Sequence, residues 1–358
     1  MTLRLVLFGD GESPHLLKWA RALAPRVELH VASSRGLAPA LAELVAPERT
    51  LVLGQATKFE GGNAALLKTL PTLVRWLRRV DADWINAHYL TSHGTLAWLA
   101  RKAGVRSQLA ASAWGSDILV APRNSRALRF VTSRVVRDAV VCTSDSRHMA
   151  ERMRELGARD VMTFPFGLDA LPEAPGAKEP WLFFANRGLE DIYDPHRVLT
   201  LFAGIASEQS EARLVVANSG SLSDALKQQA AALGLADRIE FVGRLDAATQ
   251  SAQYARARWY VSVPRSDSVS VSVLEAMGHG CIPILSDLPA NRELVRNGVN
   301  GLILPEGQQV LTVATLARLQ GDADAIATAN RDWVAANALF APCVDAFVAR
   351  LEQSTPTR

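Results

Sequence analysis

Cysteine and long apolar runs are scarce in this sequence. Its 358 residues include three cysteines, Cys142, Cys281 and Cys343, without the CxxC spacing of a zinc or redox motif. This small, odd number argues against a disulfide framework and predicts a reducing, cytoplasmic environment. No apolar run approaches the roughly 20 residues of a membrane-spanning helix. The apolar start at 3–8 is too short for a signal peptide, and we expect it to form a buried strand.

The composition is that of a globular protein whose charge is unevenly distributed. Hydrophobic residues make up 49% and charged residues 21% of the chain, which excludes a disordered protein. Residues 1–170 contain 23 Lys and Arg against 15 Asp and Glu, whereas the rest contains 16 against 21. The basic first half favours an anionic partner, such as a phosphate-bearing acceptor or a membrane surface. Drift in an Arg-rich proteome explains the bias equally well, and no motif supports binding to nucleic acid.

Short apolar runs alternate with helical patterns along the chain, which predicts α/β domains with parallel sheets. The chain exceeds the roughly 250–300 residues that one hydrophobic core supports, so we expect two domains. The expected strands are 3–8, 27–32, 84–87, 108–113 and 140–143, then 181–185, 214–217, 239–242, 259–263 and 282–285. A segment rich in Pro, Gly and Ala separates the two series. We therefore expect domains at 1–170 and 171–340, with a C-terminal helix at about 341–358 that packs back on the first.

One segment combines a strand, a serine-rich turn and a helix. The strand at 259–263 leads into small residues, among them Ser268 and Ser270, that let a phosphate approach the backbone. The first turn of a helix presents unpaired N–H groups and the positive end of its dipole, which together bind anions. Asp267 lies at the mouth of the turn, and Glu275 lies about two helical turns inside. A carboxylate at each end of such a phosphate site can hold sugar hydroxyls.

From this turn onward the sequence matches a known signature over roughly 35 residues. The stretch from Asp267 reads DSVSVSVLEAMGHGCIP, with Glu275 as its second acidic residue. It resembles the D/E-x7-E signature of family 4 glycosyltransferases, usually E-x-x-G-x-x-x-x-E-A-M-A-x-G-x-P-V. The next stretch, SDLPANRELVRNGVNGL, is similar to the family's S-D-x-x-x-x-x-E-x-V-x-x-G-x-N-G-L, with Glu293, Gly298 and Gly301 in register. The resemblance implies the GT-B fold, in which two doubly wound Rossmann-like domains face each other across a cleft.

The resemblance assigns a nucleotide-sugar site to the second domain. Asp267 would orient the donor sugar, Glu275 would hold the ribose, and Arg187 in the first βα loop would bind the diphosphate. The other donor-binding positions are Ser268, Val269, Ser270 and Val271 at the helix start, Gly243, Arg244 and Leu245 beside the base, and Asn218 and Gly220 in the usual Gly-rich turn. The structural alternatives are an N-cap for Asp267, a surface ion pair for Arg187 and a solvated helix position for Glu275.

In the first domain the resemblance implies an acceptor side. Its residues are Gly11 in the loop FGDG, His15 on the following helix, His88 in NAHY, and Trp114 and Asp117 in SAWGSD. The last two stretches are similar to the family's H-x-H and H-G-x-D segments, and a W-G-S-D version is familiar from bacterial members that build surface polysaccharide. His88 is the catalytic candidate of this domain, beside Asp267 and Arg187 in the second. Ordinary polar contacts for the two histidines and core packing for Trp114 stay open as alternatives.

Several positions depart from the family pattern. Asp267 is one methylene shorter than the usual Glu, and Asn86 and Trp114 stand where the family has histidine. The family's Lys after the diphosphate Arg is absent, so His196 or Arg197 would have to substitute for it.

Two D-x-D sequences, at 81–83 and 322–324, match the metal motif of the other large glycosyltransferase fold. The first lies in a turn, where Asp forms local hydrogen bonds, and the second lies near a helix start. Because the D/E-x7-E signature needs no metal, we expect metal-independent chemistry without a cofactor.

The resemblance implies a retaining glycosyltransferase that uses a nucleotide diphosphate sugar, with UDP favoured and GDP next. The acceptor would be a hydroxyl of a saccharide or lipid-linked saccharide in surface polysaccharide biosynthesis. Arg187 and the helix start would stabilise the departing diphosphate, whose oxygen would take the acceptor's proton. The basic helix at 66–80 is compatible with peripheral contact to an anionic inner membrane face and equally with a plain surface helix. The alternatives are a non-catalytic nucleotide-sugar-binding accessory protein and, with less support, a sugar-nucleotide epimerase.

Overall fold

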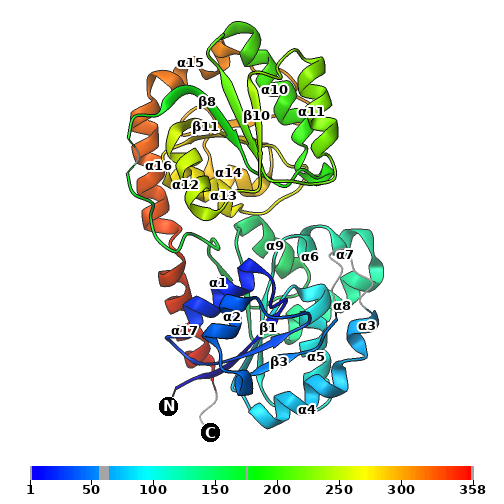
Figure 1. Cartoon of the computed structure of the whole chain (residues 1–358). Coiled ribbons are helices and arrows are strands. Elements are labelled where there is room, and N and C mark those ends of the chain that lie inside the picture. Colours follow the sequence, from blue (N-terminus) through cyan, green and yellow to red (C-terminus); the bar gives the residue numbers. More distant parts are fainter. Residues whose placement is uncertain (1, 56–63, 175, 356–358) are drawn as a thin grey trace. The chain divides into compact units, whose positions relative to one another are not determined.

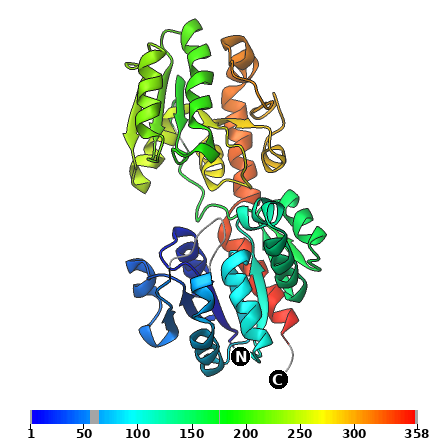
Figure 2. The same cartoon turned by 90° about the vertical axis from the view of Figure 1, so that its right-hand side faces the viewer.

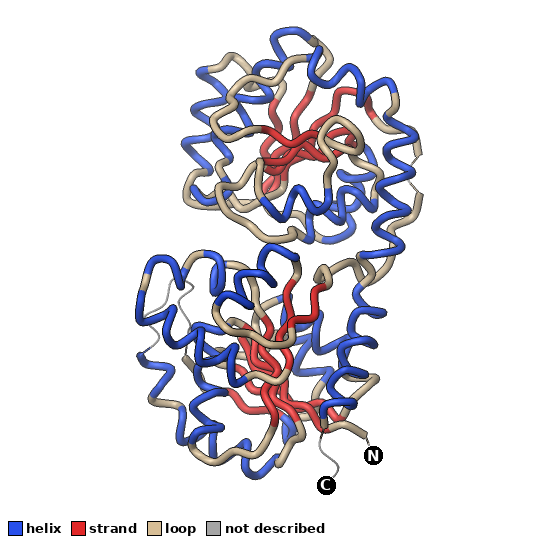
Figure 3. The backbone as a smooth tube through the Cα atoms, turned by 180° about the vertical axis from the view of Figure 1, so that it is seen from behind, coloured by secondary structure: helices blue, strands red, loops and turns tan. Residues whose placement is uncertain are grey.

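The computed structural model describes residues 2–55, 64–174 and 176–355, which form two compact units. The first unit comprises the described residues up to Phe164 together with those from Phe340 onward, and the second comprises Pro165–Leu339. In each unit the strands lie in the interior and the helices surround them (Figures 1 and 3). All strand pairs are parallel, so the predicted pair of parallel α/β domains is confirmed.

The first unit contains a seven-stranded sheet with the order β3-β2-β1-β4-β5-β6-β7. Its strands are β1 (Arg4–Gly9), β2 (Glu28–Ser33), β3 (Thr50–Val52), β4 (Trp84–His88), β5 (Gln108–Ser112), β6 (Val141–Ser144) and β7 (Val161–Thr163). Its helices are α1 (Pro14–Leu23), α2 (Pro39–Leu44), α3 (Ala64–Leu67), α4 (Leu70–Val80), α5 (Thr95–Lys102), α6 (Ser116–Leu119), α7 (Ala121–Asn124), α8 (Arg126–Asp138), α9 (Arg147–Glu155) and α17 (Phe340–Ser354). Helices cover both faces of this sheet (Figure 2).

The two faces of this sheet bury different side chains because successive strand residues point to opposite sides. Ile85 and Ala87 of β4 belong to the apolar core beneath α4, α5, α8 and α9. On the other face, Trp84 donates to the Thr355 hydroxyl after α17 (2.8 Å), and His88 packs against Trp19 of α1. The C-terminal helix α17 thus completes the layer that α1 begins.

The second unit contains a six-stranded sheet with the order β10-β9-β8-β11-β12-β13. Its strands are β8 (Glu179–Ala185), β9 (Arg213–Ala217), β10 (Ile239–Gly243), β11 (Ala257–Ser262), β12 (Ile282–Ser286) and β13 (Leu302–Leu304). Its helices are α10 (Pro195–Glu208), α11 (Ser223–Ala232), α12 (Ala247–Arg256), α13 (Val271–Gly278), α14 (Pro289–Leu294), α15 (Val313–Gly321) and α16 (Ala323–Asn337). Strands β8 and β11 are neighbours in the sheet although β9 and β10 separate them in the chain.

Some expected elements differ from those observed. The helix expected at 64–80, with an interruption at Pro71, is two helices, α3 and α4. Pro71 is the second residue of α4, where a missing N–H breaks no helical hydrogen bond. Helix α8 and the short strands β3 and β7 were not expected. Among the described residues, no helix has both the length and the apolar character needed to cross a membrane.

Candidate functional site

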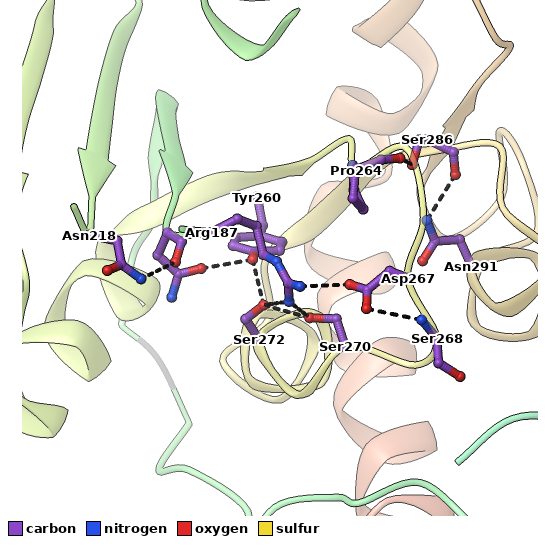
Figure 4. A network of polar contacts seen from close by, with 11 residues as sticks. Arg187, Asn218, Tyr260, Pro264, Asp267, Ser268, Ser270, Ser272, Ser286 and Asn291 are labelled. Carbon is purple, nitrogen blue, oxygen red and sulfur yellow. Dashed lines mark hydrogen bonds and ion pairs between the residues drawn. The ribbon is translucent and has the colours of Figure 1, made fainter. Parts of the chain in front are cut away.

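The carboxyl ends of β8 and β11 bring Arg187 and the serine-rich turn together in the second unit. Arg187 Nη2 lies 2.8 Å from Asp267 Oδ2. Arg187 Nη1 donates to the Ser270 hydroxyl and, at 3.2 Å, to the Ser272 hydroxyl. The guanidinium plane also lies over the ring of Tyr193, 4.5 Å from its centroid. Figure 4 shows the guanidinium between the carboxylate on one side and the two hydroxyls on the other.

Burial and charge act against each other in the Arg187–Asp267 pair. Their side chains are 19% and 22% exposed, respectively. Desolvation raises the pKa of Asp267 in spite of the nearby guanidinium. Desolvation is also the largest single effect on Arg187 and acts to lower its pKa, but Asp267 and three nearby tyrosines together raise that pKa. Arg187 Nε has no hydrogen-bond partner in the described part of the chain. The cation is therefore held in place while its Nε donor is left over.

The first turn of α13 lies directly beside this pair. Its N-cap is Ser270, whose side chain accepts no bond from the helix N–H groups because the hydroxyl is engaged with Arg187 and Ser272. Asp267 instead accepts from the N–H of Ser268 at 3.0 Å and is not the N-cap. A helix start without a side-chain cap, next to a guanidinium, is an arrangement that binds anions.

Glu275 lies on α13 and connects to a pocket at the same sheet edge. Its Oε2 accepts from Tyr254 Oη at 3.0 Å and from Gln250 Nε2 at 3.2 Å. Gln250 lines an open pocket of about 290 Å³ together with Asn186, Ala217, Asn218, Arg244 and Leu245. Three of the predicted donor-binding residues, Asn218, Arg244 and Leu245, therefore share one pocket. Asn186 and Gln250 were missed, although Asn186 precedes Arg187 in the predicted loop.

Two backbone positions shape this edge. Gly243 ends β10 with φ +68°, a conformation that favours glycine, and its carbonyl accepts from the N–H of Asn218 at 2.6 Å. A Cβ at Gly220 would lie 2.3 Å from the carbonyl oxygen of Leu189, so this turn passes close to the backbone of the β8 loop.

His196 and Arg197, the candidates for the missing Lys, bond to residues away from the Arg187 contacts. The Arg197 guanidinium donates to the carbonyls of Pro305 (2.8 Å) and Gln308 (3.0 Å), and burial lowers its pKa. His196 Nδ1 lies 2.6 Å from Gln229 Oε1 on α11. Both side chains thus tie α10 to its neighbours.

The corresponding edge of the first unit is built from aromatic rings and histidine. The Trp114 ring packs against His15 (centroids 4.6 Å apart) and against His88 (5.4 Å). His88 is fully buried and also meets the edge of Trp19 at 5.2 Å. Neither of its ring nitrogens has a hydrogen-bond partner within the described ranges, and burial lowers its pKa well below the usual value. The imidazole is therefore neutral at physiological pH.

Asp117 joins two loops at this edge. Its carboxylate accepts from the N–H groups of Leu90 (2.8 Å) and Trp114 (2.9 Å). Burial raises its pKa to about 6, against the opposing effect of these donors. Its contacts are with the backbone of the loops, so it holds the Trp114 loop against the turn that follows Tyr89.

The remaining sequence candidates of the first unit lie inside the fold. Gly11 donates to the Ser33 hydroxyl at 2.8 Å, and a Cβ there would lie 2.5 Å from the carbonyl oxygen of Gly36. Asn86 accepts from Ser112 at 2.7 Å between the strands. His93, which sequence reasoning missed, bridges the His88 carbonyl and Ser34.

Aspartates of both D-x-D sequences contact residues that are distant in the chain. Asp81 ends α4 in the left-handed region (φ +47°), and Asp83 accepts from the N–H of Arg4 at 2.9 Å. Asp324 pairs with Arg258 at 2.8 Å. A search of the described residues found no group of three or more His, Cys, Asp or Glu side chains that could hold a metal.

Two family models match the chain, one in each unit. Residues 171–332 match the model described as "Glycosyl transferases group 1", and residues 4–146 match "Glycosyl transferase 4-like". A phosphatidyl-myo-inositol mannosyltransferase of Mycobacterium leprae is 26% identical over 339 residues, which cover 87% of this chain and 84% of that protein. An alpha-monoglucosyldiacylglycerol synthase of Streptococcus pneumoniae is 28% identical over 106 residues, 30% of this chain and 24% of that protein.

Solved structures with the same fold include Anabaena Alr3699/HepE in complex with UDP. It superimposes with a TM-score of 0.78 at 16% sequence identity and covers 98% of this chain and all of that one. The likeness over nearly the full length extends to both units and their parallel sheets.

Proposed function

The chain belongs to the family 4 glycosyltransferases of the GT-B fold, and we propose that it is a retaining enzyme that transfers a sugar from a nucleotide diphosphate sugar to a hydroxyl acceptor. One observation carries the donor assignment. Arg187, Asp267 and the start of α13 form a single cluster, and Glu275 lies farther along the same helix. The Arg187 fork and the helix start supply positive charge where the diphosphate leaves. That charge makes a metal unnecessary.

In this proposal the donor extends along the strand ends of the second unit. The base and ribose occupy the pocket beside Asn218, Arg244 and Leu245, with Glu275 and its partner Gln250 near the ribose hydroxyls. The diphosphate lies at Arg187 and the α13 start. We propose UDP as the nucleotide, with GDP next; the solved relative in complex with UDP supports this choice.

Binding of the diphosphate changes the environment of Asp267. In the structure its carboxylate neutralises Arg187 at 2.8 Å. A diphosphate at the guanidinium takes over this neutralisation, so the carboxylate is left to accept hydrogen bonds from the hydroxyls of the donor sugar. An oxygen of the leaving diphosphate takes the proton of the attacking hydroxyl, so no protein base is needed for this step.

We propose that the acceptor is a saccharide or lipid-linked saccharide of surface polysaccharide biosynthesis. The names of both relatives contain a lipid, phosphatidyl-myo-inositol in one and a glucosyldiacylglycerol in the other, which supports a lipid-linked acceptor. The acceptor residues are Gly11, His15, His88, Trp114 and Asp117. The half-buried Trp114 ring offers an apolar face to a sugar ring, and the buried, neutral His88 packs against that ring.

We also propose that the enzyme works at the cytoplasmic membrane face through the basic helices of the first unit. Helix α4 exposes Arg75, Arg78 and Arg79, and α8 exposes Arg126, Arg129 and Arg134. Phe130 on α8 is 58% exposed, and the Arg134 guanidinium lies 5.0 Å from its ring centroid. Flotation with phosphatidylglycerol vesicles tests this; equal binding to neutral phosphatidylcholine vesicles would contradict it.

The donor assignment is tested by measuring the unfolding temperature with UDP, GDP, CMP and their sugars. A nucleotide at about 100 times its Kd stabilises by about 2.7 kcal/mol, which raises Tm by roughly 5–10 °C for a unit of this size. UDP compounds are expected to give the largest shift. A flat panel, or normal transfer rates in both Asp267→Ala and Glu275→Ala, would contradict the proposed donor site.

A further inference from the structure

A continuous chain of hydrogen bonds joins Arg187 to Glu275 in the second unit. Its members, in order, are Arg187, Ser270, Ser272, Tyr260, Asn186, Tyr254 and Glu275. Tyr260 and Tyr254 are fully buried, at 0% and 1% exposure, inside the apolar cluster that contains Leu274. The sequence signature names only Arg187, Ser270 and Glu275, so the two tyrosines and Asn186 enter this chain through the tertiary structure alone.

The half of the chain next to Arg187 consists of hydroxyl groups. Arg187 Nη1 donates to Ser270 and to Ser272, and the two serine oxygens are 2.8 Å apart. The Ser272 hydroxyl is 2.9 Å from Tyr260 Oη. Figure 4 shows Tyr260 reaching from β11 toward these serines at the start of α13. This half therefore connects the sheet to the proposed diphosphate site.

The half next to Glu275 passes through an amide. Tyr260 Oη lies 2.8 Å from Asn186 Oδ1, Asn186 Nδ2 lies 2.7 Å from Tyr254 Oη, and Tyr254 Oη lies 3.0 Å from Glu275 Oε2. Asn186 is itself only 8% exposed. Each partner is within ordinary hydrogen-bond distance, so the chain has no gap between guanidinium and carboxylate.

The two ends fix the direction of every hydrogen in between. Carboxylate and carbonyl oxygens only accept, so Tyr254 gives its hydrogen to Glu275 (3.0 Å), with the Ser272 carbonyl as a longer second acceptor (3.2 Å), and it accepts from the Asn186 amide nitrogen. The Asn186 oxygen then accepts the hydrogen of Tyr260, and the Tyr260 oxygen accepts from Ser272. A guanidinium only donates, which fits the opposite end. All donors point from Arg187 toward Glu275, and bonds aligned in this way strengthen one another.

We propose that Tyr260, Asn186 and Tyr254 are positioning residues that couple the diphosphate subsite at Arg187 to the ribose subsite at Glu275. The inference rests on the proposed donor site. A ligand that accepts hydrogen bonds from Arg187 weakens the bond from Arg187 to Ser270, and this changes the strength of Ser270 as a donor. The aligned chain passes that change to the Glu275 carboxylate. Phenylalanine at either tyrosine position would fill the same apolar space. The two hydroxyls are therefore needed for the hydrogen-bond chain and not for packing.

The test is a double-mutant cycle for UDP affinity, measured by calorimetry in two backgrounds. In the wild-type background, Arg187→Lys and Glu275→Gln are expected to deviate from additivity by about threefold or more in Kd. In the Tyr260→Phe background the same pair is expected to be additive within about 1.5-fold. A cycle that is additive in the wild type, or equally non-additive in both backgrounds, would overturn the inference.

Controls separate coupling from general damage. Thr328→Val removes the hydroxyl of a threonine on α16 that donates to the Asp324 carbonyl, and it is expected to keep the wild-type deviation. Tyr254→Phe breaks the same chain at another link and is expected to behave like Tyr260→Phe, which keeps the test valid if Tyr260→Phe unfolds. Wild-type protein that binds neither UDP nor GDP would refute the proposed donor site and this inference with it, whereas binding with an additive cycle refutes the inference alone.

Discussion

The strand ends of the two units carry opposite kinds of side chain. In the second unit, Arg187, Asp267 and their serine partners are charged or hydroxylic, and they are connected to one another by an ion pair and hydrogen bonds. In the first unit, His88 and Trp114 form an aromatic group in which the imidazole nitrogens have no partner among the described residues. An edge with oriented charges is suited to a phosphate, and an aromatic edge to an uncharged ring bearing hydroxyls.

Both edges share backbone strain directly after a strand. Tyr89 follows β4 with φ +66°, and Asn218 follows β9 with φ +84°. Left-handed conformations of non-glycine residues cost energy and persist only where surrounding contacts impose them. In both units a left-handed residue directly after a strand thus shapes the loop, although the side chains that the two loops carry differ.

The largest expected effect is the loss of the Arg187 guanidinium. Arg187→Ala removes the charge beside the proposed diphosphate, and we expect kcat/KM to fall about 10²–10³-fold, as for loss of a preorganised donor to developing charge. Arg187→Lys keeps the positive charge but loses the two-pronged guanidinium, so it should retain only part of the wild-type activity. Steady-state transfer assays measure both. Full activity in Arg187→Ala would contradict the proposal that the edge of the second unit binds the diphosphate.

Asp267→Asn should separate donor binding from transfer. The substitution removes the charge that neutralises Arg187, so we expect UDP to bind as tightly as before or more tightly, while transfer falls about 10- to 100-fold. Asp267→Glu, with the usual family residue, is the matched control and should retain activity. Calorimetry with UDP and transfer kinetics are the two measurements; parallel losses in both would contradict a role in orienting the sugar.

A substitution at the aromatic edge should leave the donor edge unchanged. Trp114→Ala removes the ring that packs on His15 and His88, and we expect the KM for the acceptor to rise about tenfold while UDP affinity changes less than twofold. Trp114→Phe should restore part of the loss. Weaker UDP binding in Trp114→Ala would show that the two edges are not independent.

The smallest expected effect is on stability. His88 has a folded pKa far below its unfolded value, so below about pH 6.5 protons bind preferentially to the unfolded chain and stability is lost as pH falls. Between pH 7 and 5, His88→Phe should therefore lose less unfolding free energy than the wild type. Urea unfolding at both pH values measures this.

Two other buried groups, one in each unit, serve as references for that measurement. Asp117, with a folded pKa of about 6, acts with the opposite sign, because its contribution to the unfolding free energy falls as pH rises from about 4 to 6. Asp117 is present in both the wild type and His88→Phe, so its effect cancels in the comparison. His279 in the second unit has a pKa lowered to about 4 by burial. His279→Phe should reduce the acid sensitivity of the second unit in the same way. An unchanged pH slope in His88→Phe would show that its imidazole is hydrated in solution.

Sequence reasoning located the second edge better than the first. The ordered signature around Asp267 and Glu275 predicted a strand, a turn and an anion-binding helix start, because residue types at fixed local spacing report local structure. It did not predict Tyr260, since an aromatic residue in a buried strand has the pattern of ordinary core. In the first unit, His93 and the loop-joining role of Asp117 depend on contacts that no local pattern encodes.

The sequence by itself determined the family, the two α/β halves and the loops of the proposed site, because strand periodicity and turn residues act over short distances. Only the tertiary structure decided which loops meet. Arg187 and Asp267 are far apart in the chain, and they form an ion pair because β8 and β11 are adjacent in a parallel sheet. Parallel strands end at the same edge, so the residues that follow them converge there.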